Sequence, residues 1–403
     1  MRWAILALLF LSTVINFVDR QTLSVVAPVL RDEFRISNTQ YGFIVASFQL
    51  GMLAGEFPMG LLMDRWGARR GFTFAVIWWS IASMLHGAAN SVRHFSLLRF
   101  WLGTGECGNF SGATKVIGEW FPPKERALGM GIFNSGTMVG TIIAAPLVVW
   151  LVHQYNWRVA FVVPSVLGLF WVGAWLAVYR TPPQSGPAAP APTNRQLLGL
   201  RQTWAVILAR TLAGPVMHLY VYWLPEYLYR QRGFSLRDIG LFAWVPFLFA
   251  DIGSVVGGWF SGWLIARGMS VDRARRISIA IGTALTVASF GVAMVRSVPL
   301  AFALICITLF GFLWLSANFF AVISDLFPGN AVGRVTGLTG IGNAASSIVL
   351  NLTTGFVVDH FSYAPVFVAA ALLPALGMSL LFALAGRIRR IEPATIAVSD
   401  GHS

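Results

Sequence analysis

The stretch ILALLFLSTVINFVDRQTLSVVAPVL (residues 5–30) is long enough to cross a bilayer, yet near its middle it carries an acid and a base side by side. A membrane-spanning helix needs about 20 mostly apolar residues. A charge at the bilayer centre costs about 2.5–3.5 kcal/mol on insertion scales, so it persists where it faces a protein interior or a water-filled cavity. Asp19 and Arg20 therefore indicate a membrane protein whose first span carries function, and protonatable acids beside fixed guanidinium groups suggest anion movement coupled to protons.

The composition agrees with a membrane location. Of the 403 residues, 56% are hydrophobic and only 11% are charged, whereas ordinary soluble domains have about 25% charged residues. The net charge of +13 does not indicate nucleic-acid binding, because the arginines lie in short loops between apolar runs rather than on one face. No Walker motif, metal-ligand cluster or nucleophile–base spacing is present. We therefore expect no enzyme activity, no metal site and no cofactor.

Apolar runs of sufficient length predict twelve spans. They are expected at residues 4–30, 39–63, 71–91, 95–121, 127–152, 158–179, 201–225, 238–266, 277–296, 298–326, 333–357 and 364–386. An even number of spans places both termini on one side. The loops on that side hold roughly twice as many Arg and Lys residues as the other loops, which predicts cytoplasmic termini.

The chain also divides into similar halves. RISNTQYGFI (35–44) resembles GFSLRDIGLF (233–242), and the same offset carries Gly60 onto Gly258 and Arg69 onto Arg267. The proline-rich stretch TPPQSGPAAPAPTN (181–194) lies between the halves and predicts a flexible or polyproline linker. We expect an N-terminal six-helix bundle (1–180), a cytoplasmic linker (181–199), a C-terminal bundle (200–390) and a cytoplasmic tail (391–403). Two such halves are typical of a rocker-type transporter with its site between them.

Charged residues within the spans mark the candidate site. Asp19 and Arg20 lie about 100° apart on a helix, so each needs a partner elsewhere. Arg20 suits a bound carboxylate, and a structural ion pair with a neighbouring helix is the alternative. Arg99 and Glu106 share one helical face, which Asn109 continues, although Arg99 could also serve in structural pairing. If a proton on Glu106 and an anion on an arginine influence each other, each alters the other's affinity by the same factor.

Further polar residues have two interpretations each. Lys115 and Glu119 have the spacing of a local ion pair, with assistance to substrate exit as the alternative for Lys115. His218, near Tyr222 and Arg210, is either a proton carrier or a hydrogen-bonded packing residue. Asp251 could pair with Arg210. Sugar-acid hydroxyls or helix packing could explain the neutral polar residues of the later spans, which are Ser316, Asn318, Asn343, Ser347 and Asn351.

Several stretches resemble known transporters. GLLMDRWGARR (60–70) resembles the loop between spans two and three of the major facilitator superfamily. NFVDRQTLSVVAP (16–28), RFWLGTGECGNFSGATKVIGEWFPPKERA (99–127) and WLSANFFAVISDLFP (314–328) resemble the anion:cation symporter family, which includes hexuronate, galactonate and glucarate permeases, sialin and the vesicular glutamate transporters. Gly262 departs from this pattern, because the second-half counterpart of the loop usually has Asp there.

The resemblance implies an all-α membrane protein with twelve transmembrane helices in two pseudo-symmetric six-helix bundles. It implies that Asp19 and Glu106 carry protons, that Arg20 holds a substrate carboxylate, and that Asn343 contacts the substrate. We expect the substrate-binding set to be Arg20, Arg99, Asn109, Asn343, Ser316, Asn318, Tyr222 and His218. A structural or gating set is expected to comprise Asp64, Arg65, Arg69, Lys115 and Glu119.

The resulting functional expectation is proton-coupled symport of a small organic anion, a hexuronate or related sugar acid, by alternating access. The expected location is a bacterial inner membrane, and the expected oligomeric state is a monomer. The alternatives are uptake of an aromatic or dicarboxylic acid such as phthalate or tartrate, anion exchange without protons, and a transporter-like metabolite receptor.

Overall fold

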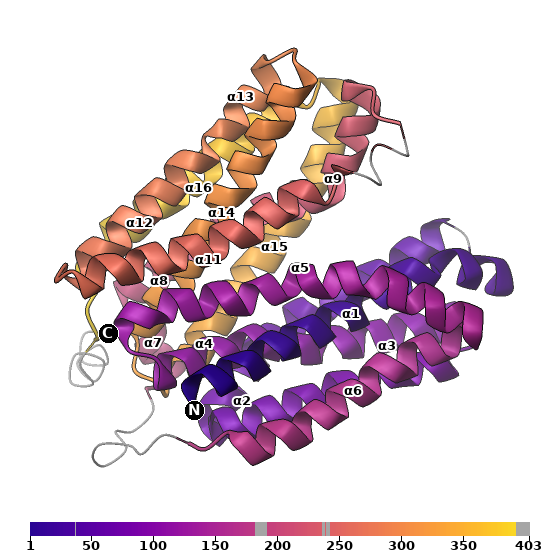
Figure 1. Ribbon diagram of the computed structural model, residues 1–403, viewed down its shortest axis with the longest axis horizontal. Coiled ribbons are helices and arrows are strands. Elements are labelled where there is room, and N and C mark those ends of the chain that lie inside the picture. Colours follow the sequence, from indigo (N-terminus) through magenta and orange to yellow (C-terminus); the bar gives the residue numbers. More distant parts are fainter. Residues whose placement is uncertain (37, 182–191, 236–237, 239–241, 392–403) are drawn as a thin grey trace. The chain divides into compact units, whose positions relative to one another are not determined.

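A computed structural model describes residues 1–36, 38–181, 192–235, 238 and 242–391, and this part of the chain is helical apart from short connections (Figure 1). Its helices are α1 (Arg2–Phe34), α2 (Asn38–Leu85), η1 (His86–Ala88), α3 (Val92–Glu106), α4 (Gly108–Trp120), α5 (Pro123–Gln154), α6 (Trp157–Val178), α7 (Asn194–Gly199), α8 (Arg201–Ala213), α9 (Pro215–Arg232), α11 (Val245–Ala266), α12 (Val271–Thr286), α13 (Ala288–Met294), α14 (Val298–Leu326), α15 (Val332–His360) and α16 (Ala364–Ala385).

These helices follow the twelve expected spans, which confirms the predicted fold class. Within the described residues, nine helical stretches are long and apolar enough to cross a membrane. One of them, Gln40–Ala88, contains two expected spans. The fourth span is divided between α3 and α4, and α15 is not among the nine.

Three spans are each formed by two helices, which hydropathy alone does not predict. The fourth span is interrupted at Cys107, the seventh at Gly214 and the ninth at Val287. At the seventh span the cause is chemical, because Pro215 has no N–H for the preceding turn and its ring clashes with the carbonyl four residues earlier. The interruption of the fourth span directly follows Glu106. The interruption of the seventh span lies one turn after Arg210.

The ends of the helices follow ordinary capping chemistry. Ser91, Asn156, Ser270 and Ser297 each accept a hydrogen bond from a backbone N–H of the helix that follows. Between the second and third spans, α2 turns at Gly67, whose φ of 76° lies in the region that glycine adopts without strain. The sequence predicted a linker at 181–199. Residues 182–191 lie outside the described part, and α7 occupies the end of this segment.

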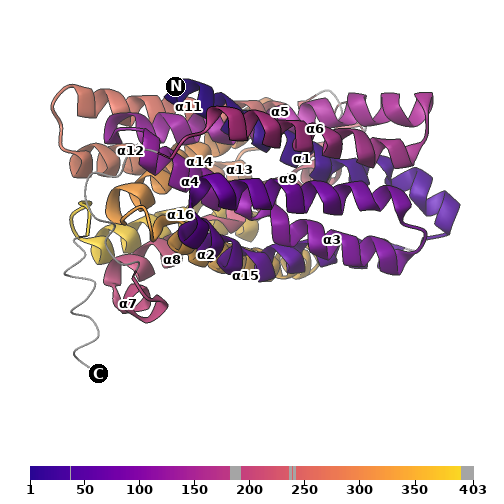
Figure 2. The same ribbon diagram turned by 90° about the horizontal axis from the view of Figure 1, so that it is seen from below.

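The contacts divide the chain into two compact units. Unit 1 comprises Met1–Trp120, Ile132–Ala191 and Gly329–Leu338, and unit 2 comprises Phe121–Gly131, Pro192–Pro328 and Thr339–Ser403. In unit 1, α2 packs against α3, α4 and α6, and α1 lies beside α6 (Figure 2). In unit 2, α14 packs between α11 and α12, and α8 lies beside α16. Each unit therefore includes the first turns of a helix whose remainder belongs to the other unit, namely α15 for unit 1 and α5 for unit 2.

The first turns of α15 and α5 each pack closely against a helix of their unit, α2 and α11 respectively. The two contacts are equivalent and show the internal repeat in the structure. In unit 1, α2 approaches the start of α15 so closely that a Cβ on Gly60 would overlap the carbonyl oxygen of Gly333. In unit 2, α11 approaches the start of α5 in the same way, and a Cβ on Gly258 would overlap the carbonyl of Ala127. GEWFP (118–122) and SDLFP (324–328) precede the two starts and are a matching sequence signal.

The repeat fails at one functional position. Asp64 of α2 has no acidic counterpart on α11, where Gly262 stands. A Cβ at Gly262 would overlap the carbonyl oxygen of Lys124, which is a backbone atom and cannot move away as a flexible side chain could. The packing of α11 on α5 therefore excludes any side chain at this position, which explains the departure seen in the sequence.

We predict that Gly262→Ala lowers the free energy of unfolding by about 1–3 kcal/mol, the usual cost of overpacking. Gly173→Ala is the matched control, because Gly173 is also helical but has no atom within 4 Å of an added Cβ. The control should be neutral or stabilising by about 0.5–1 kcal/mol. Thermal unfolding in detergent measures both variants, and equal stability of the two would contradict the packing argument.

Candidate functional site

In unit 1, an ion pair joins the first span to the fourth. Arg20 of α1 donates from Nε and Nη2 to the same oxygen of Glu106, Oε2, at 3.0 and 2.8 Å. Glu106 is the last residue of α3, and its side chain is fully buried, whereas that of Arg20 is 26% exposed. The second carboxylate oxygen, Oε1, is buried and has no hydrogen-bond partner within the described residues. This carboxylate therefore retains an acceptor that could bind a proton.

Arg99 lies close to this pair but is bonded very differently. Its side chain is buried, with a residue exposure of 2%, and its one hydrogen bond within the described residues runs from Nη1 to the carbonyl oxygen of Arg20 at 3.3 Å. Nε and Nη2 are buried without a partner, and no described carboxylate lies within 4.0 Å of the guanidinium group. The guanidinium groups of Arg20 and Arg99 lie 5.0 and 6.0 Å from the ring centre of Phe48. Two positive groups therefore share one apolar neighbour.

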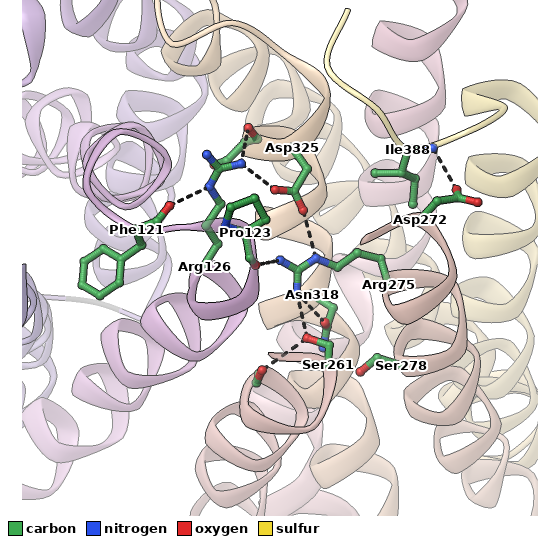
Figure 3. Close-up of polar contacts among 12 residues, drawn as sticks. Phe121, Pro123, Arg126, Ser261, Asp272, Arg275, Ser278, Asn318, Asp325 and Ile388 are labelled. Carbon is green, nitrogen blue, oxygen red and sulfur yellow. Dashed lines mark hydrogen bonds and ion pairs between the residues drawn. The ribbon is translucent and has the colours of Figure 1, made fainter. Parts of the chain in front are cut away.

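Unit 2 provides an internal comparison for this arginine. Arg275 is equally buried, yet its guanidinium group is surrounded by acceptors (Figure 3). These acceptors are Asp325 Oδ2 at 3.0 Å, Ser261 Oγ at 2.7 Å, Asn318 Oδ1 at 3.4 Å and Pro123 O at 2.6 Å. Asp325 also accepts from Arg126 at 2.6 Å. A buried charge that serves structure has its counter-ion and hydrogen bonds supplied by the fold, whereas Arg99 has one hydrogen bond and no ion pair within the described residues.

Asp19, the other predicted proton carrier, has a partner that the sequence analysis missed. Ser83 of α2 donates to Asp19 Oδ1 at 2.8 Å, and Oδ2 is buried without a partner in the described structure. Ser80, Ser83 and His86 follow each other at intervals of three residues on the third span, and all three are buried. That spacing places them on one helical face. The sequence could therefore have predicted a polar face on the third span as the partner of Asp19.

Asn109 connects α4 to α1. Its Oδ1 accepts from Ser12 at 3.0 Å, and its Nδ2 donates to Thr13 at 3.1 Å. The residue is completely buried. Its amide is thus used in holding the two helices together, and the predicted contact with substrate remains untested.

The predicted gating residues are centred on Asp64. Its carboxylate accepts from the backbone N–H groups of Gly333 and Arg334 at 3.0 and 2.9 Å, which caps the start of α15. It also forms ion pairs with Lys115 and Arg334, both at 3.2 Å. Negative charge at a helix N-terminus is stabilising.

The other members of this set differ in their contacts. Lys115 pairs with Glu119 at 3.6 Å, as the spacing predicted, and it also donates to the Gly329 carbonyl. Glu119 accepts a hydrogen bond from Tyr179 at 3.0 Å. Arg69 donates to the Leu176 carbonyl at 2.8 Å, and Arg65 is exposed.

In unit 2, two predicted substrate residues, His218 and Asn343, lie around the interrupted seventh span, and so does Arg210. His218 of α9 is hydrogen-bonded to Ser347 of α15 at 3.2 Å. Asn343 of α15 packs against the interruption, where a Cβ on Gly214 would overlap its Oδ1, and this oxygen is buried without a partner among the described residues. Arg210 donates to Thr339 at 3.2 Å and lies 4.6 Å from the ring centre of Phe320.

The remaining candidates have different environments. Asn318 donates to the carbonyls of Gly257 and Trp314 and accepts from Arg275, so its amide is fully used. Ser316 is partly buried. The side chain of Tyr222 lies outside the described residues. The alternative pairing of Asp251 with Arg210 is wrong, because Asp251 forms no ion pair or hydrogen bond in the described part of the chain.

Comparisons with known proteins agree with this architecture. The family model of the Major Facilitator Superfamily matches residues 9–270. A hexuronate transporter of Escherichia coli (strain K12) is 29% identical over 424 residues, covering 99% of this chain and 98% of the relative. A galacturonate transporter of Dickeya chrysanthemi is 30% identical over 279 residues, covering 64% of this chain and 81% of the relative. The solved structure of the proton:xylose symporter XylE has a TM-score of 0.74 at 14% identity and covers 96% of each chain, which shows likeness of fold.

The contrast between the two buried arginines gives a stability prediction. Arg99→Met should raise the free energy of unfolding by about 1–2 kcal/mol, because it removes a buried guanidinium group with two donors that have no acceptor within the described residues. Arg275→Met should lower it by about 3–5 kcal/mol, because it leaves Asp325 and several acceptors without their donor. Thermal unfolding in detergent, without added anions, measures both. If Arg99→Met were as destabilising as Arg275→Met, Arg99 would be a structural residue.

Proposed function

Because the chain belongs to the Major Facilitator Superfamily and is a multi-pass membrane protein, we propose that it transports a small organic anion, specifically a hexuronate or related sugar acid, in symport with protons. The observation that carries this proposal is the buried guanidinium of Arg99, with two donors left without a partner within the described residues. A carboxylate with its two oxygens fits the planar fork of such a group.

The charges of the site support coupling to protons. Asp19, Glu106 and Arg99 are buried, and with the partly exposed Arg20 they form a group of two acids and two bases, which is neutral when both acids are ionised. Each proton bound to an acid leaves one positive charge uncompensated, and burial makes such a charge costly. A substrate carboxylate offsets one such positive charge. Proton binding and anion binding therefore favour each other, and linkage requires the effect to be mutual.

Arg20 supplies the geometric part of the coupling. Its Nε and Nη2 are both directed at Glu106 in this structure. A proton on Glu106 removes the negative charge that holds them, and Arg20 then becomes available to the substrate beside Arg99. In the proposed cycle, Asp19 and Glu106 take up protons from outside, the arginines bind the carboxylate, and loss of the protons inside releases it.

The identity of the substrate rests on other observations. Relatives spanning nearly the whole chain are named for hexuronate, galactarate or D-glucarate, and D-galactonate, and all of these are hydroxylated carboxylates. Hydroxyl groups need neutral hydrogen-bonding partners, and Asn343 retains a buried oxygen without a partner in the described structure. Tyr222, Ser316, His218 and Asn109 complete the proposed substrate-binding set.

We place the protein in a bacterial inner membrane with both termini in the cytoplasm, as the distribution of Arg and Lys suggests. On that side, we propose that the contacts of Asp64 with Lys115 and Arg334 help to hold one state of the transport cycle.

Uptake into proteoliposomes tests the function. Radiolabelled glucuronate or galacturonate should accumulate when the outside is acidic, and collapse of the proton gradient should abolish accumulation. Phthalate and tartrate serve as competitors for the aromatic and dicarboxylic alternatives. Uptake that does not respond to the proton gradient would indicate exchange without protons. Substrate binding without uptake would indicate a receptor.

Glu106→Gln tests the coupling step, because glutamine resembles the protonated glutamate. We expect gradient-driven accumulation to fall more than tenfold, while exchange of internal for external substrate persists with little dependence on pH. Glu119→Gln is the matched control on the same span, because Glu119 is bonded to Lys115 and Tyr179 instead of to the arginine site. The control should keep its response to the gradient. Normal accumulation by Glu106→Gln would contradict the assignment.

A further inference from the structure

Asp251 of α11 is a buried acid that the proposed cycle does not use. It lies within a membrane-spanning helix and is 8% exposed. Among the described residues it makes no hydrogen bond and no ion pair, which distinguishes it from Asp64 and Asp325. Intramembrane acids are costly, and those that serve structure are paired or hydrogen-bonded. Asp251 therefore has no visible structural role.

A second polar group with the same property lies beside it. Ser254 is completely buried, and its Oγ has no hydrogen-bond partner in the described part of the chain. Residues three apart are neighbours on a helix, so Asp251 and Ser254 form a small polar patch on α11. The patch continues towards Gly258 and Gly262, which pack on the start of α5 in unit 2.

Among the described residues of the helices around Asp251, no charged group compensates this acid. The helices that pack against α11 are α14 and α12, together with the first turns of α5. Their titratable or charged residues are Cys306 and Asp325 on α14, Asp272, Arg273, Arg275 and Arg276 on α12, and Lys124, Glu125 and Arg126 on α5. Except for Cys306, these residues lie near the end of α11 that contains Ser261, about 15 Å along the helix from Asp251.

An ionised carboxylate in this setting would be buried with neither a counter-ion nor a donor, so the neutral acid is the favoured form. Asp251 is not completely enclosed, because 8% of its surface is exposed. We propose that Asp251 is a third proton-binding carboxyl group, located in unit 2, which loads and releases a proton during transport in addition to Asp19 and Glu106. This inference rests on the proposed proton-coupled function.

Comparison of the two halves indicates that the fold does not require an acid at the position of Asp251. The position equivalent to Asp251 in the first half is Leu53, whereas the packing glycines Gly60 and Gly258 are retained in both halves. The scaffold therefore accepts an apolar residue at this place on the helix. The acid is specific to the second half.

The proton-to-substrate ratio provides the test. In proteoliposomes with a fixed substrate gradient, the proton gradient at which net flux becomes zero gives this ratio. We expect Asp251→Asn to lower the ratio by one proton per substrate, while exchange of substrate across the membrane persists. Asp251→Glu should keep the wild-type ratio. Ser254→Ala is the matched control from the same patch and should also leave the ratio unchanged.

The outcomes separate this inference from the proposed function. If the wild-type protein transports sugar acids without any response to the proton gradient, the proposed coupling fails. If the wild-type protein is coupled and Asp251→Asn has the same ratio, only the role of Asp251 is refuted. Loss of substrate exchange in both Asp251→Asn and Asp251→Glu would also refute it, because the acid would then be needed for the structure.

Discussion

The arrangement of charge around Arg20, Glu106 and Arg99 is the constraint on which the rest of the structure depends. The guanidinium group of Arg99 and the carboxylate of Glu106 are buried next to the partly exposed Arg20, and the carboxylate uses only one of its oxygens to hold Arg20. Arg99 has no counter-ion among the described residues. In a medium of low polarity such a group is stable only while positive and negative charges balance. Under the proposed proton-coupled mechanism, this balance is what links proton binding to anion binding.

The fold holds this group in place through features of the helices that carry it. The fourth span is interrupted at Cys107, directly after Glu106, so the carboxylate lies at a helix end instead of in a continuous turn. Asn109 then fixes the following helix to α1 by bonding Ser12 and Thr13. Neutral hydrogen bonds next to the arginines and the acid thus help to position them. Such bonds can persist when the charges of the site change.

The sequence predicted the positions of the charged residues well, because an acid or a base inside an apolar stretch of 20 or more residues is conspicuous. It also predicted that Asp19 and Arg20 would need separate partners. It could not identify Ser83 as the partner of Asp19, because a serine in a span is common and its orientation depends on how the third span packs. The divided helices were missed for a related reason. Hydropathy reports whether a segment can cross a membrane, but it does not report where the backbone hydrogen bonds are interrupted.

The internal repeat shows which residues the fold requires and which the chemistry requires. The glycines that allow close helix contact, Gly60 and Gly258, occupy equivalent places in the two halves. Arg20 is not repeated in this way. The equivalent position in the second half is His218, which is hydrogen-bonded to a neutral residue, Ser347. A packing contact must be present in both halves if both are to form the same helix arrangement. Under the proposed mechanism, a charge balance is needed only at the anion site of the first half, so the two halves could diverge in chemistry while keeping one scaffold.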